Sequence, residues 1–90
     1  MSNHESEQVD QSLLFEVIEN QLADAYPAKV KATLMRLRMT GHSQEEAMEL
    51  IACALAPEML AVVEQQQQFN LARYEQHLDL LPQTPWLEAE

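Results

Sequence analysis

The sequence SQEEAMELIACALAPEMLAVV, residues 43–63, decides the fold of this chain. It begins with a capping box, in which the Ser43 hydroxyl accepts a hydrogen bond from the backbone N–H of Glu46 while the Glu46 carboxylate reaches back. Apolar residues then recur at the spacing of three and four that is typical of one helix face. These residues are Ala47, Leu50, Ile51, Ala54 and Leu55. The stretch therefore predicts a helix that begins near Gln44.

Pro57 lies inside this stretch, and two interpretations fit. Either one long helix kinks there or a second helix begins there, because proline lacks the backbone donor that a helix interior uses. The spacing of four nevertheless continues through Ile51, Leu55, Met59 and Val63. We favour one kinked helix from Gln44 to Gln67, since the apolar phase is unbroken.

Two helices are predicted before this stretch. The first runs from Val9 to Ala25 and ends before Pro27, which disfavours helical angles at the residue preceding it. Its apolar residues recur four apart at Leu14, Ile18 and Leu22. The second has Pro27 in its first turn and ends at Gly41, the only glycine of the chain, as a left-handed cap.

A last helix is predicted between Asn70, a residue type favoured at N-caps, and Pro82. Its apolar face consists of Leu71, Tyr74, Leu78 and Leu81. We expect a disordered leader over residues 1–8, a single helical domain over 9–82 and an extended or loose tail over 83–90. The fold class is all-α, a small bundle of four or five helices with short connections.

The composition restricts the function classes. The 90 residues carry a formal net charge of -10, which argues against a nucleic-acid binder and against adhesion to anionic membranes. No secretory signal or membrane-spanning stretch is visible, and the single cysteine excludes an intramolecular disulfide. We therefore expect a cytoplasmic protein that binds neither nucleic acid nor membranes.

The charge is segregated along the chain. Residues 1–26 carry six acids and no base, residues 27–42 carry four bases and no acid, and residues 43–90 carry nine acids and one base. The four bases are Lys29, Lys31, Arg36 and Arg38. They either complement neighbouring acidic helices, which we favour, or form a docking face for an acidic partner or a second subunit.

Trp86 is the other candidate interaction residue. It lies in the tail, which is too short to build a core of its own, and tryptophan is a frequent anchor of interfaces. It either docks onto the helical body, which we favour, or meets a partner.

No arrangement of residues indicates catalysis. The histidines lack the His-x-x-x-His spacing of a zinc site, and Cys53 in the centre of a helix is more simply a small buried thiol than a nucleophile. Glu45 and Glu49 lie one helical turn apart and could offer oxygen ligands to a divalent metal. Acids in a first turn also stabilise the helix dipole, which we favour. We expect no cofactor and lean against an enzyme.

Part of the chain is similar to a known group of domains. The segments EVIENQL at residues 16–22 and FNLARYEQHLDLLP at 69–82, together with Pro27 and the Gly41 turn, resemble small uncharacterised bacterial helical domains of unknown function. The resemblance covers about residues 10–82. It implies an all-helical fold and no settled activity.

Members of that group carry two His-x-x-x-His pairs that look like a metal site. The matching positions here are Gln11 and Phe15, then Glu45 and Glu49, so all four histidines are absent. The resemblance thus implies that any such site is lost or altered.

The sequence leads to two hypotheses of different classes. The first is a non-catalytic helical module that interacts with a protein partner or with itself, because a homodimer would help so short a chain to bury its apolar faces. The alternative is a metal-binding protein that uses Glu45 and Glu49.

Overall fold

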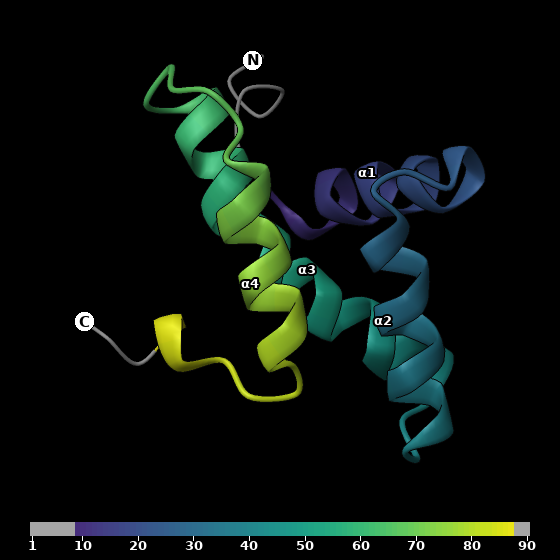
Figure 1. Cartoon of the computed structure of the whole chain (residues 1–90). Helices are drawn as coiled ribbons and strands as arrows, with labels where there is room; N and C mark the ends of the chain where they lie inside the picture. Colours follow the sequence, from purple (N-terminus) through teal and green to yellow (C-terminus); the bar gives the residue numbers. More distant parts are fainter. Residues whose placement is uncertain (1–8, 88–90) are drawn as a thin grey trace.

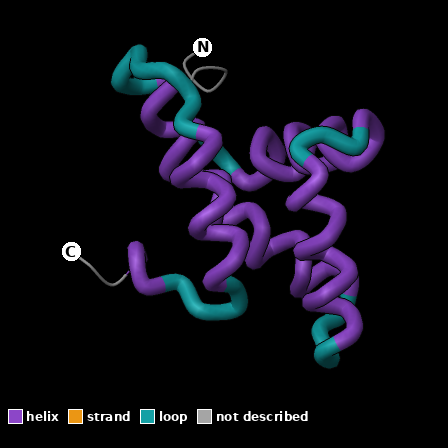
Figure 2. Tube along the Cα trace, viewed as in Figure 1, coloured by secondary structure: helices purple, strands orange, loops and turns teal. Residues whose placement is uncertain are grey.

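The computed structural model describes residues 9–87, and these form four α-helices and one short 3₁₀ helix (Figure 1). The elements are α1 (Gln11–Asp24), α2 (Ala28–Met39), α3 (Gln44–Val63), α4 (Leu71–Leu80) and η2 (Pro85–Leu87). No strand occurs among residues 9–87 (Figure 2). The predicted all-α bundle is therefore confirmed, while the predicted leader over 1–8 and the last three residues of the tail lie outside the described residues.

Helix α3 is the central element. It packs against α1, α2 and α4 (Figure 1). Six of its residues belong to the buried apolar core. The buried core comprises Leu14, Ile18, Val30, Leu37, Ala47, Met48, Ile51, Ala52, Ala54, Leu55, Tyr74, Leu78 and Leu81. Among residues 9–87, no helix is both long and apolar enough to cross a membrane.

Both caps predicted around residues 40–46 are present. The backbone N–H of Glu46 donates to Ser43 Oγ at 3.0 Å, and the Ser43 N–H donates to Glu46 Oε1 at 3.1 Å, so the capping box is complete. Gly41 has a φ of 108° at the end of α2. The N–H groups of His42 and Gly41 donate back to the carbonyls of Leu37 and Arg38, which is a Schellman motif.

Helix α3 passes through Pro57 without dividing, as predicted, but it ends at Val63 and not at Gln67. Gln66 adopts a left-handed φ of 57°, and the N–H of Gln67 donates to the Ala61 carbonyl at 2.8 Å. No apolar residue follows Val63 until Phe69. Residues 64–68 therefore have no apolar side chain that could pack against the bundle and stabilise a longer helix.

The first two helices also begin later than predicted. The side chain of Asp10 accepts from the N–H of Leu13 at 2.9 Å, so Asp10 is the N-cap and α1 begins at Gln11 instead of Val9. Pro27 occupies the corresponding position before α2, immediately outside the first turn.

Candidate functional site

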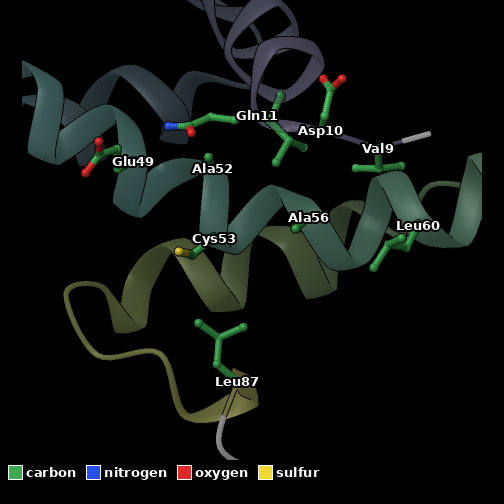
Figure 3. A pocket seen from close by; sticks show the side chains of 10 residues that line it. Val9, Asp10, Gln11, Glu49, Ala52, Cys53, Ala56, Leu60 and Leu87 are labelled. Atoms are coloured by element: carbon green, nitrogen blue, oxygen red, sulfur yellow. The ribbon is translucent and has the colours of Figure 1, made fainter. Parts of the chain in front are cut away.

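An apolar groove lies on the outer face of α3, between the start of α1 and the short helix η2 (Figure 3). Its volume is about 460 Å³. Residues spaced by three and four along α3 form its length, and Leu87 of η2 forms one side. We call it the α3 groove; its lining is Val9, Asp10, Gln11, Leu14, Glu49, Ala52, Cys53, Ala56, Leu60 and Leu87.

A second hollow continues the α3 groove towards the N-terminus of α3. It shares two lining residues with the groove, and its full lining is His42, Glu46, Glu49, Leu50 and Cys53. The carboxylates of Glu46 and Glu49 make this end acidic, whereas Asp10 lies further along the groove, beside Val9 (Figure 3). No lysine or arginine among the described residues lines either hollow. The combined surface is therefore apolar along its length and negative at one end.

Cys53 is half-buried where the two hollows meet. Burial raises the pKa of the Cys53 thiol, and the negative charge of Glu49 raises it by a smaller amount. The thiolate is the reactive form of cysteine, so this environment does not activate Cys53 as a nucleophile. Its place in the groove instead makes it a natural position for a chemical probe.

The wall of the groove depends on Pro57. A helical carbonyl normally accepts from the N–H four residues later, and for Cys53 that residue is Pro57, which has no N–H. The indole Nε1–H of Trp86 donates to the Cys53 carbonyl at 2.9 Å instead. The tail is thus docked onto α3 by a donor that replaces the one missing from the helix, and this docking places Leu87 beside the groove.

Trp86 also packs against α4. Its ring stacks on His77, with centroids 4.1 Å apart and an angle of 16° between the planes. The His77 Nδ1 is buried and has no hydrogen-bond partner within residues 9–87. Burial lowers the pKa of His77, with a smaller opposing influence from Glu58 and a smaller reinforcing one from Arg73. Burial beneath Trp86 thus favours the neutral imidazole over the charged one.

Glu58 is a buried carboxylate that the sequence analysis did not single out. Its side chain is fully buried and accepts from Nε and Nη2 of Arg73, whose side chain is 42% exposed. Glu58 Oε1 also accepts from the backbone N–H of Asn70 at 3.0 Å. These bonds fasten the start of α4 to α3 and leave the carboxylate with a structural role.

Two of the four bases on α2 face the bundle. Lys29 pairs with Asp79 at 2.9 Å. Arg36 donates to the carbonyls of Leu78 and Leu81 at 3.0 and 2.8 Å. The Leu78 carbonyl also accepts from the N–H of Leu81, so the guanidinium adds to the cap at the C-terminal end of α4. Lys29 therefore pairs with an acid of α4, whereas Arg36 binds carbonyl groups at the C-terminal end of that helix.

The other two bases face outwards. Arg38 donates to the side-chain oxygen of Gln44 at 2.7 Å, and Lys31 is exposed and makes no ion pair with any residue in 9–87. They therefore stay available as a positive surface on α2.

The candidate metal ligands Glu45 and Glu49 are both exposed on the first turns of α3. Within the described part of the chain, no group of three or more His, Cys, Asp or Glu side chains is placed to hold a metal ion. Of the four positions that match the histidine pairs of the resembling domains, Gln11 and Glu49 both line the α3 groove (Figure 3). Phe15 packs against the core instead.

The α3 groove itself was not predicted, although the sequence contains a signal for it. Helix α3 is apolar on two faces: Ile51 and Leu55 belong to the core, while Leu60 lies outside it and Ala56 lies at the boundary, packed against the core and lining the groove. A helix that is apolar all round has more surface to cover than one core uses. The position of Leu87 beside the groove and the hydrogen bond from Trp86 to the Cys53 carbonyl depend on tertiary structure, so no local sequence pattern indicates them.

Comparison of this chain with protein-family models, with curated proteins and with solved structures finds no match. The resemblance to the small bacterial domains therefore stays a prediction.

Proposed function

We propose that this protein is a non-catalytic helical interaction module that associates with a second copy of itself through the α3 groove. The observation that carries the proposal is the groove, an apolar channel along a central helix with an acidic end. Grooves of this kind accept the apolar face of an amphipathic helix, with anchors at positions i, i+3/i+4 and i+7.

The chain also supplies apolar surface of its own to such contacts. Met35 and Met39 are 53% and 81% exposed, and Leu60 and Leu87 at the groove are 39% and 54% exposed. Methionine is common at adaptable binding surfaces because its side chain is unbranched and flexible. Self-association would remove these side chains from water.

Sedimentation velocity over a concentration series tests the proposal. We expect the chain to pass from monomer to oligomer between low and high micromolar concentration. Cys53 is the only cysteine, so its rate of alkylation by iodoacetamide reports access to the groove directly. We expect alkylation to slow at the concentrations where the oligomer forms.

A matched pair of variants localises the contact. Leu60→Lys places a charge in the groove, whereas Leu80→Lys places one on α4 at a residue of similar exposure, 45%, that does not line the groove. We expect Leu60→Lys to abolish association and Leu80→Lys to preserve it. A chain that stays monomeric throughout, or an oligomer in which Cys53 reacts as fast as in the monomer, would overturn the proposal.

A further inference from the structure

The exposed face of α2 is the surface of this chain that best fits the α3 groove. Its outward residues Ala28, Ala32, Met35 and Met39 are spaced i, i+4, i+7 and i+11, so they form one stripe. Lys31 and Arg38 flank that stripe and are also exposed. We call these six residues the α2 stripe.

The two surfaces match in length. The α2 stripe extends from Ala28 to Met39, and the groove extends along α3 from Glu49 to Leu60. Each span covers eleven residue steps, which at 1.5 Å per residue is about 16 Å. A helix laid along the groove would therefore keep its apolar residues in contact over the full length.

The two surfaces also match in charge. The α2 stripe carries Lys31 and Arg38 and no acid, whereas the groove and the adjoining hollow are lined by Asp10, Glu46 and Glu49 and by no lysine or arginine. Opposite charges beside an apolar contact fix the register of two surfaces and disfavour other pairings. The other two bases of α2 are already engaged with α4 within the same chain.

From this complementarity we infer that the occupant of the α3 groove is α2 of a second copy, with Met35 and Met39 on the apolar floor and Lys31 near Glu49. The inference rests on the proposed function and specifies which element enters the groove. Because the two surfaces differ, every contact joins the α2 stripe of one copy to the groove of another.

Charge reversal with mixing tests this pairing in the full chain. Lys31→Glu places a carboxylate in the α2 stripe against Glu49, and Glu49→Lys places an ammonium group in the groove against Lys31. Each variant alone should raise the dissociation constant of the oligomer at least about tenfold. An equimolar mixture of the two should associate again, because the carboxylate at residue 31 then meets the ammonium group at residue 49, and the unaltered stripe of one variant meets the unaltered groove of the other.

Glu19→Lys is the matched control, since Glu19 is an exposed carboxylate on α1 that does not line the groove. Glu19→Lys alone should keep the dissociation constant of the wild-type chain, because its α2 stripe and its groove are unaltered. Circular dichroism of each variant shows that the helices are retained.

The outcomes separate the two proposals. If the wild-type chain associates and Leu60→Lys prevents it, but neither charge reversal alters the dissociation constant, the groove stands and α2 is not its occupant. Loss of association in both reversed variants without recovery on mixing would likewise overturn the pairing. A wild-type chain that is monomeric at every concentration would overturn the proposed function together with this inference.

Discussion

At the scale of single residues, Pro57 determines more than the course of its own helix. It leaves the Cys53 carbonyl without an intrahelical donor, and Trp86, 33 positions further on, supplies the replacement. A proline inside a helix is therefore matched here to a tryptophan in the tail. The match explains why a segment with no buried residue of its own is held against the bundle.

Replacing Trp86 by Phe should expose this link. The ring is kept but the N–H is lost, so the part-buried carbonyl of Cys53 has no donor, which costs about 1–2 kcal/mol of unfolding free energy. In a Pro57→Ala background the N–H of residue 57 can bond to that carbonyl, so the same change should cost about 1 kcal/mol less. Urea unfolding of the four chains measures the difference; equal costs in both backgrounds would contradict the link.

His77 should make the docking of the tail dependent on pH. Its folded-state pKa lies below the ordinary value of 6.5, so between those two values the unfolded chain binds more protons than the folded one. Stability is therefore complete above about pH 6.5 and falls as the pH is lowered towards the folded-state pKa. His77→Phe keeps an aromatic platform under Trp86 without a titrating group.

We expect the wild-type chain to lose more stability than His77→Phe when both are brought from about pH 7 to about pH 5. Emission of Trp86, the only tryptophan, follows the tail separately from the helices. Parallel pH profiles for the two chains would show that His77 does not contribute.

At the scale of elements, α1 and α2 end in the same left-handed backbone conformation, but with different residues. Ala25 and Gly41 both have positive φ, at 57° and 108°, and both helices close with paired backbone bonds to the preceding turn. Glycine adopts these angles without a steric penalty, whereas alanine does not.

Ala25→Gly should therefore stabilise the protein by about 0.5–1 kcal/mol, because it relieves the left-handed strain. Gly41→Ala should destabilise it by about 1–2 kcal/mol for the same reason. A Cβ at residue 41 would meet no atom within 4 Å, so the cost at this position is one of backbone angle and not of packing. Thermal and urea unfolding give both changes; effects of the same sign would contradict the common cause.

Helix α3 combines a core face, a groove face and a buried carboxylate. Its apolar residues surround most of the helix, and Glu58 occupies the core face in the same phase as Ile51 and Leu55. A charge at such a position needs a partner when it is buried, and Arg73 is the only base in residues 43–90. The pair could have been suggested from these two facts, but its geometry could not.

At the scale of the whole molecule, the segregated charge has two separate consequences. Lys29 and Arg36 join α2 to α4 within one chain. Lys31 and Arg38 remain on the outside, opposite in sign to the acidic end of the groove. The bases of α2 thus divide into an inward pair and an outward pair, because successive residues of one helix point in different directions. That the outward pair forms a docking face stays a proposal.

Local sequence patterns were sufficient for the all-α class, the capping box of Ser43, the turn at Gly41 and the continuity of α3 through Pro57. These features depend on residues within about one helical turn of each other, and hydrogen bonding and apolar spacing at that range are visible in the sequence.

Tertiary structure alone decided the rest: the groove on α3, the docking of Trp86 and the burial of Glu58 against Arg73. Each joins groups 15 or more positions apart, or leaves a helix face uncovered, which only the packing of the bundle determines. The apolar pattern of a helix indicates how much apolar surface it has to bury, and the arrangement of the neighbouring helices decides which part of that surface stays exposed.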